Sequence, residues 1–280
     1  MRTRPFGPTG VRVPVIGQGT WQLEQADPQT AIRTLNTGID AGMTHLDTAE
    51  SYGAGAVEEL VGQAVRHRRH EVFLASKVRP VRADTRGTVA ACEGSLRRLG
   101  TDHLDLYLLH WPSQHPLEDT LTGLRQLHRD GKILHYGVSN FYDQHLTDLF
   151  AYTEPGEITC NQVLYHLGER SVEHHVATTC LAASSAVVGY SPFGLGNFPP
   201  SPQAATVLDR IAHSHAATRR QIALAFLTRS PHTFAIPRTA TPAHALENAG
   251  AAQITLTEQD TADLATACPL PADDGHLPVT

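Results

Sequence analysis

An α/β fold, a single-domain (β/α)8 TIM barrel over residues 1–280, is predicted by three observations on this sequence. Apolar runs able to form strands alternate with helical patterns along the whole chain, eight such strands can be placed, and 280 residues suit a fold that commonly occupies about 250. Strands joined in sequence by helices must lie parallel with right-handed crossovers, so eight units favour a closed barrel over an open sheet.

The N-terminal part shows the unit that repeats. Residues 9–14 contain a turn signal and predict a short hairpin or edge piece, and residues 15–21 then form an apolar strand that runs into a glycine-containing loop. Asp27 offers a helix cap with proline at the next position, and Gly42 ends the helix. A doubly wound fold is disfavoured because residues 17–22 lack the third glycine of its phosphate turn.

The later elements follow the same pattern. The remaining strands are separated or followed by helices. Helical patterns are expected near residues 56–66, 84–99 and 256–267, together with extra helices. The fourth strand is nearly continuous in leucine, as expected of a strand buried on both faces, and a proline after Trp111 stops its pairing. His110 should therefore lie at the carboxyl end of that strand, where α/β proteins keep their chemistry. The strands after the first are expected near residues 44–47, 72–77, 104–110, 134–139, 158–163, 186–191 and 233–237.

Composition excludes several classes of function. The net charge of −6 disfavours broad nucleic-acid binding, and no apolar run approaches the roughly 20 residues that span a bilayer. The N-terminus is basic but has no apolar core behind it, so it does not resemble a secretion signal, and a cytoplasmic location is predicted. Four scattered cysteines without a CxxC pair argue against a metal site or a disulfide framework.

Four polar side chains are expected to converge at the carboxyl ends of the strands. Asp47, Lys77 and His110 end the second, third and fourth strands, and Tyr52 follows the second. Each has a simpler interpretation as a helix cap, a surface charge, a strand-closing histidine or a rim aromatic, but together they favour chemistry. A phenol titrates near 10 and can act as an acid at neutral pH only if its anion is stabilised, which the Lys77 ammonium can do while Asp47 holds it charged.

This set of groups suits carbonyl reduction. Hydride arriving at the carbonyl carbon creates an alkoxide that Tyr52 can protonate, and His110 can orient the substrate oxygen. No protein side chain supplies hydride, so a cofactor is required.

Motifs along nearly the whole chain resemble the aldo-keto reductases, and the run 161–168 is similar to bacterial members that reduce methylglyoxal and other small aldehydes. The resemblance implies a barrel that binds NADPH or NADP+ without a Rossmann domain, with Tyr52 as the general acid of a catalytic tetrad completed by Asp47, Lys77 and His110. The matching motifs are Asp47-Thr-Ala-Glu-Ser-Tyr52, Ala75-Ser-Lys77, Leu109-His110-Trp-Pro, Gly137-Val-Ser-Asn140-Phe, Asn161-Gln162 and Ile236-Pro-Arg238.

The same resemblance implies the cofactor contacts. Hydroxyl and amide side chains would hold the carboxamide of the nicotinamide, and the nicotinamide ring would stack on Tyr190. The loop after Tyr190 would follow the pyrophosphate. Arg238 would hold the 2′-phosphate, and residues farther along the chain would contact the adenine. His244 stands where many relatives carry a second arginine, which weakens the preference for NADPH. The implied contacts are Gly19, Thr20, Asp47, Ser139, Asn140, Gln162, Tyr190, Ser191, Phe193, Gly194, Ile236, Arg238, Thr239, Glu247 and Asn248.

The substrate side is implied more coarsely. Trp21 and Trp111 match positions that line the mouth of the site beside Tyr52 and His110, although either indole could belong to the core. The chain beyond the last helix is short, so we expect an open mouth, small or varied carbonyl substrates and a monomer. The alternative function is a nucleotide-binding regulatory subunit that keeps the barrel but senses redox state.

Overall fold

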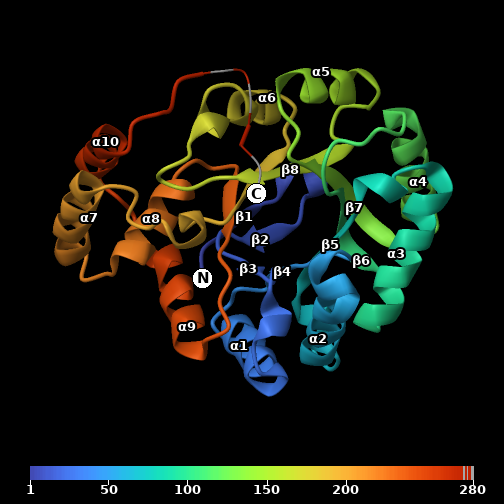
Figure 1. Ribbon diagram of the computed structural model, residues 1–280, viewed down its shortest axis with the longest axis horizontal. Helices are drawn as coiled ribbons and strands as arrows, with labels where there is room; N and C mark the ends of the chain where they lie inside the picture. The colour runs from blue at the N-terminus through green and yellow to red at the C-terminus, as the bar shows by residue number, and fades with distance from the viewer. Residues whose placement is uncertain (274, 276, 279–280) are drawn as a thin grey trace.

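The computed structural model describes residues 1–273, 275 and 277–278. In this part of the chain, eight parallel strands form one sheet in the order β10-β9-β8-β7-β6-β5-β4-β3. Parallel bridges from Ile16 to Ala235 and from Gly19 to Arg238 join the two ends of that order. The sheet is therefore a nearly closed barrel with helices around it (Figure 1), and the predicted fold is confirmed.

The strands lie where the sequence predicts them, apart from the first. The first strand was expected to begin at residue 15, but regular strand pairing is limited to the two residues of β3. The residues just before β3 contact β10 instead, where the N–H of Gly17 donates a hydrogen bond to the carbonyl of Ala235 (2.8 Å). The barrel strands are β3 (Gln18–Gly19), β4 (His45–Asp47), β5 (Phe73–Val78), β6 (Leu104–Leu109), β7 (Ile133–Ser139), β8 (Ile158–Leu164), β9 (Ala186–Tyr190) and β10 (Thr233–Ile236); β1 (Thr3–Pro5) and β2 (Arg12–Pro14) form the predicted antiparallel hairpin.

The helices also follow local signals in the sequence. Asp27 caps the first helix by accepting a hydrogen bond from the N–H of Thr30 at 2.8 Å, as its place before a proline predicts. None of the helices in the described ranges is long and apolar enough to cross a membrane. The helices are α1 (Pro28–Asp40), α2 (Ala56–Val65), α3 (Thr85–Leu99), α4 (Leu117–Arg129), α5 (Asp143–Ala151), α6 (Val176–Ala182), α7 (Pro202–Ser214), α8 (Arg219–Leu227), α9 (Pro242–Gly250) and α10 (Glu258–Ala267).

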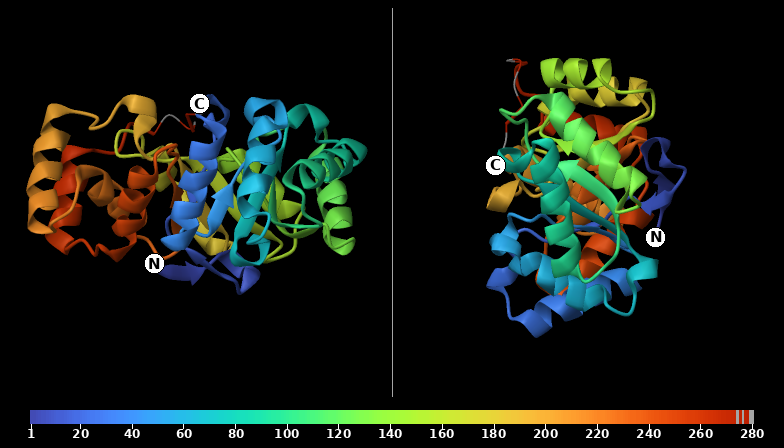
Figure 2. Two further views of the ribbon diagram at one scale, coloured as in Figure 1. Left: turned by 90° about the horizontal axis from the view of Figure 1, so that it is seen from below. Right: turned by 90° about the vertical axis from the view of Figure 1, so that its right-hand side faces the viewer.

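The N-terminal hairpin covers one end of the barrel (Figure 2). Phe6, which follows β1, is fully buried, and its ring lies 5.1 Å from that of Phe73 and 5.0 Å from that of Phe234. Both partners stand at the beginning of their strands, as does His45, whose ring is 5.8 Å away. The hairpin therefore plugs the amino end of the strands and leaves the carboxyl end open for a site.

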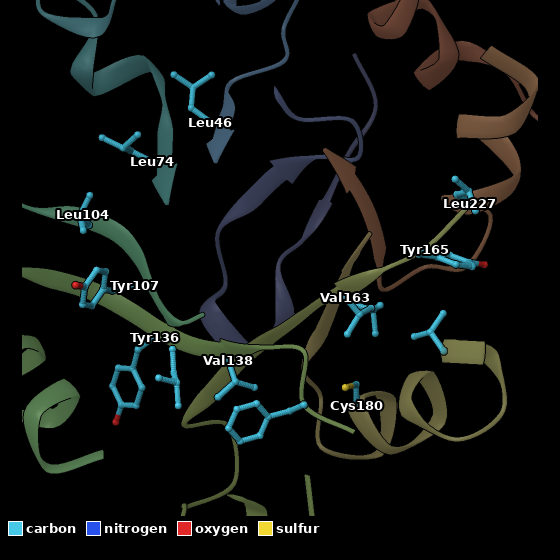
Figure 3. Packing of buried hydrophobic residues seen from close by; sticks show 14 of the residues in the cluster. Leu46, Leu74, Leu104, Tyr107, Tyr136, Val138, Val163, Tyr165, Cys180 and Leu227 are labelled. Atoms are coloured by element: carbon cyan, nitrogen blue, oxygen red, sulfur yellow. The ribbon is translucent and has the colours of Figure 1, made fainter. Parts of the chain in front are cut away.

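Alternation along the strands decides which side chains enter the barrel. Tyr107, Val138 and Val163 belong to the large apolar cluster between strands and helices, and Figure 3 shows them pointing away from the barrel centre. Leu106 and Leu108 belong instead to the cluster inside the barrel. Because successive strand residues face opposite sides, polar residues in register with these inner leucines must also face inward at the open end.

Candidate active site

A cavity of about 580 Å³ opens at the carboxyl ends of the barrel strands. Its volume lies within the range of about 300–1,000 Å³ that is usual for small-molecule sites. Most of the residues that the sequence assigns to a site come together here. Those that line the cavity are Gly19, Thr20, Trp21, Asp47, Tyr52, His110, Trp111, Ser139, Asn140, Gln162, Tyr190, Ser191, Phe193, Ile236 and Arg238.

Other predicted residues lie outside this lining. Lys77 is fully buried behind the wall of the cavity. The carboxylate of Glu247 accepts a hydrogen bond from the hydroxyl of Thr218 at 2.6 Å, and His244 is exposed on α9. The implied cofactor residues that do not line the cavity are Gly194, Thr239, Glu247 and Asn248.

Pro192 also lines the cavity and lies within the segment 191–194 that was expected to follow the pyrophosphate. Four further residues line the cavity without having been predicted: Gln22, Leu195, Gly196 and Arg220. Two of them lie in the loop after β9, so extending the predicted pyrophosphate segment by two residues finds them. Arg220 is different, because it lies in the first turn of α8, to which the sequence assigned no site. A pair of arginines at a helix start is its sequence signal, and such a pair is usually a solvated helix end.

The centre of the site is a buried ion pair that reaches the phenol. The Nζ of Lys77 lies 2.6 Å from Oδ1 of Asp47, 2.9 Å from the carbonyl oxygen of Thr48 and 3.3 Å from the hydroxyl of Tyr52. An ammonium has three hydrogens, so these three partners fix its position. The other oxygen of Asp47 accepts a hydrogen bond from Nε2 of Gln162 at 2.7 Å. Both members of the pair are essentially inaccessible to water, at 0% and 1% exposure.

This arrangement sets the protonation of the phenol. Burial alone would lower the pKa of Lys77, but Asp47 and Tyr52 together bring that pKa above its ordinary value, so the ammonium stays charged. Burial also raises the pKa of Tyr52, and the ammonium offsets part of that rise. The predicted acidifying effect of Lys77 on Tyr52 is present in sign, but burial outweighs it here. Tyr52 is therefore fully protonated at neutral pH and holds a proton that it can donate.

His110 is neutral in this site. Burial first, and the nearby Lys77 charge second, place the pKa of His110 well below its ordinary value. Its ring stacks on the indole of Trp111 with centroids 3.8 Å apart, and its backbone carbonyl accepts a hydrogen bond from Nδ2 of Asn140 at 3.0 Å. A neutral imidazole held in this way can donate one hydrogen bond to an oxygen in the cavity.

The inner wall carries amide and hydroxyl groups. Asn140 adopts a left-handed backbone with a φ of 61°, which asparagine tolerates better than most residues, and its Oδ1 accepts a hydrogen bond from the hydroxyl of Tyr190 at 2.9 Å. The hydroxyl of Ser139 donates to the carbonyl of Gln162 at 2.8 Å. The amide nitrogen of Asn140 donates its two hydrogens to the carbonyl of His110 and to Oγ of Ser139, at 3.0 and 3.2 Å, whereas Nε2 of Gln162 keeps one hydrogen beside the one donated to Asp47 and can serve a further acceptor.

Comparison with known proteins decides the family. Residues 15–268 match the sequence model of the Aldo/keto reductase family. The chain belongs to the aldo/keto reductase family. It is accordingly an oxidoreductase, and members of this family use a nicotinamide cofactor.

Individual aldo/keto reductases are similar over nearly the whole chain. Methylglyoxal reductase YeaE of Escherichia coli (strain K12) is 38% identical over 264 residues, which cover 93% of either protein, and glyoxal reductase of Bacillus subtilis (strain 168) is 32% identical over 254 residues, which cover 90% of this chain and 87% of that protein. An aldo/keto reductase from Klebsiella pneumoniae, solved in complex with NADP and acetate, superposes with a TM-score of 0.93 at 37% identity and covers 99% of both chains.

The cavity fits the cofactor class that aldo/keto reductases use. A nicotinamide dinucleotide has a flat ring bearing a carboxamide at one end and several phosphate oxygens farther along. Here the inner wall offers the ring of Tyr190 and the amides of Asn140 and Gln162, and the outer part offers the guanidinium groups of Arg220 and Arg238. The groups that line the cavity therefore match the parts of the cofactor in kind.

Proposed function

We propose that the chain reduces aldehydes or ketones to alcohols with NADPH, and that Tyr52 is the general acid. The observation that carries this proposal is the chain of contacts from Asp47 through Lys77 to the Tyr52 hydroxyl, at distances of 2.6 and 3.3 Å, which ends in the cavity. The names of its relatives support the same chemistry, since they include a methylglyoxal reductase and a glyoxal reductase. A Klebsiella pneumoniae aldo-keto reductase that is 36% identical was solved with NADPH.

When bound, the reduced nicotinamide supplies the hydride that attacks the carbonyl carbon. The protein supplies the proton and the orientation. Tyr52 donates its phenolic proton to the carbonyl oxygen as negative charge develops there, and the Lys77 ammonium stabilises the phenolate that remains. Asp47 keeps that ammonium charged and aimed. Neutral His110 donates a hydrogen bond that positions the same oxygen.

The cofactor is proposed to lie along the cavity in one direction. Ser139, Asn140 and Gln162 would hold the carboxamide, and Tyr190 would cover one face of the ring. The segment 191–194 would follow the pyrophosphate. The implied contacts farther out are Arg238 and Thr239 for the 2′-phosphate and Glu247 and Asn248 for the adenine, with Gly19, Thr20 and Ile236 along the wall.

The substrate would enter between two indoles. Trp21 is 41% exposed at the rim, and Trp111 lies deeper, stacked on His110. No residue after Arg238, among those that the structure describes, lines this cavity, which supports an open mouth and small carbonyl substrates. Residues 274, 276, 279 and 280 of the short tail lie outside the described residues.

We further propose one domain over residues 1–280, a monomer and a cytoplasmic location.

The proposed reaction is tested by the loss of NADPH absorbance with a panel of activated aldehydes that includes methylglyoxal and nitrobenzaldehyde. Turnover on the order of one per second or faster is expected on at least one of them, as for ordinary enzymes. Turnover below about one per hour on every aldehyde, while NADPH still binds, would instead favour a redox-sensing regulatory subunit.

Arg238→Ala is expected to weaken NADPH binding about tenfold or more and to leave NADH binding nearly unchanged, because only NADPH carries the 2′-phosphate that a guanidinium can bind with paired donors. Titration of cofactor fluorescence measures both affinities. His244→Ala is the control, since His244 is exposed and does not line the cavity. An equal loss for both cofactors, or an equally large effect of His244→Ala, would show that Arg238 does not hold the 2′-phosphate.

A further inference from the structure

Arg220 is a cation that lines the cavity but belongs neither to the catalytic tetrad nor to the residues proposed to hold the 2′-phosphate. It is the second residue of α8, and it lines the cavity together with the loop after β9. Its guanidinium carbon lies 5.4 Å above the ring centroid of Phe193 in that loop. Within the described ranges, no carboxylate or hydrogen-bond acceptor pairs with Arg220, although its side chain faces a cavity that contains other polar groups.

The neighbouring arginine, Arg219, is an ordinary surface arginine that is paired with a carboxylate. Arg219 occupies the preceding position of the same helix, and its guanidinium pairs with both carboxylate oxygens of Asp209. Arg219 does not line the cavity. The two adjacent arginines therefore have the same charge and lie in the same first turn of α8, but of the two only Arg220 has its donors available to a ligand.

The contact with Phe193 bears on how Arg220 can bind a ligand. A cation over an aromatic ring is attracted by the ring itself and needs no hydrogen-bond acceptor, and a guanidinium carries five N–H donors. The contact with Phe193 therefore helps to hold the side chain in place and leaves donors for a ligand. Paired in-plane donors match the oxygens of a phosphate better than any neutral group, so the ligand of this residue is expected to be a phosphate.

The position of Arg220 along the cavity indicates which phosphate of the cofactor it can bind. Tyr190 ends β9 beside Asn140, at the proposed nicotinamide end, and Phe193 follows only a few residues later in the same loop. Arg238 lies after β10, and its guanidinium donates to the carbonyl of Gln22 at 2.7 Å, on the side of the cavity formed by the loop after β3. Phosphate sites in such barrels commonly use the loops after the last two strands, which here are β9 and β10. The two guanidiniums thus serve different stretches of the ligand.

We propose that Arg220 binds the diphosphate that joins the two halves of the nicotinamide cofactor and holds it against the loop of residues 191–196. The proposal rests on the proposed function, because it assumes that the cavity takes this cofactor. The diphosphate is shared by NADPH and NADH, so Arg220 contributes to the affinity for both, whereas Arg238 contributes only where the 2′-phosphate is present.

The test is direct binding, measured by quenching of tryptophan fluorescence, of NADPH, NADH and reduced nicotinamide riboside, which carries no phosphate. Arg220→Ala should weaken NADPH and NADH by the same factor, about tenfold or more, and should leave the affinity for the riboside unchanged. Arg219→Ala, which removes the same charge one residue away, should change none of the three. Arg220→Lys should restore part of the affinity, because an ammonium supplies the charge but not the paired donors.

Three outcomes overturn the inference about Arg220 alone. One is a loss confined to NADPH, which would make Arg220 a second ligand of the 2′-phosphate. Another is a loss of equal size in Arg219→Ala, which would show a general charge effect. The third is unchanged affinity in Arg220→Ala with a thermal melting curve like that of the wild type. A wild-type protein that binds none of the three ligands overturns the proposed function and this inference with it, whereas binding without aldehyde turnover overturns only the proposed reaction.

Discussion

Tyr52→Phe is expected to lower kcat by about 10²–10⁴-fold while leaving the affinity for NADPH nearly unchanged. The hydroxyl that is removed lies 3.3 Å from Nζ of Lys77, and it is needed only when charge develops on the carbonyl oxygen. Steady-state rates at saturating NADPH on one good aldehyde, together with a separate cofactor titration, measure the two effects independently.

Two results would contradict this assignment. A variant that keeps more than about a tenth of the wild-type kcat, while chemistry is rate-limiting, would mean that another group delivers the proton. His110 is the nearest candidate, but its pKa is placed well below its ordinary value by burial and by Lys77, so at neutral pH it carries no extra proton. A large loss of NADPH affinity would instead show that the phenol holds the cofactor.

Lys77→Met is expected to lower kcat by a similar factor of about 10²–10⁴, because a phenol without its neighbouring cation becomes a poorer acid. It should also reduce the free energy of unfolding by about 3–5 kcal/mol, since it leaves the buried Asp47 carboxylate without a counterion. Urea denaturation measures the stability, and the aldehyde assay measures the rate.

The double variant Asp47→Asn/Lys77→Met separates the two effects. Removing both charges from a buried pair costs less stability than removing one, so the double variant should unfold at a higher urea concentration than Lys77→Met. Its kcat should stay as low as that of Lys77→Met, because the cation beside Tyr52 is still missing. A double variant that is no more stable than the single one, or that recovers activity, would show that the pair acts differently from this account.

Local sequence signals predict most of the barrel. The nearly continuous leucines of β6, the cap at Asp27 and the proline after Trp111 each act over a few residues, so they can be read without knowledge of distant contacts. The first strand is less predictable. Residues 15–17 are apolar, but their pairing depends on β10, which lies more than two hundred residues away, and the regular ladder there shrinks to Gln18–Gly19.

The candidate site was predictable wherever a strand ends. Asp47, Lys77 and His110 sit two residues beyond inward-facing neighbours, and strict alternation sends each of them into the barrel. Resemblance to a family added the residues of the inner wall. Neither route could find Arg220, because α8 reaches the cavity only when the helix layer closes around the sheet and brings that helix beside the loop of Phe193.

The sequence by itself determined the alternation of strands and helices, the convergence of the tetrad and the membership of a family, since these depend on spacing and residue type. Only the tertiary structure decided the protonation states and the second cation of the cavity. Burial of Tyr52 outweighs the charge of Lys77, and the degree of burial depends on what the rest of the chain packs around the phenol. The task of Arg220, unlike that of Arg219, depends on which carboxylate and which aromatic ring the fold brings within reach.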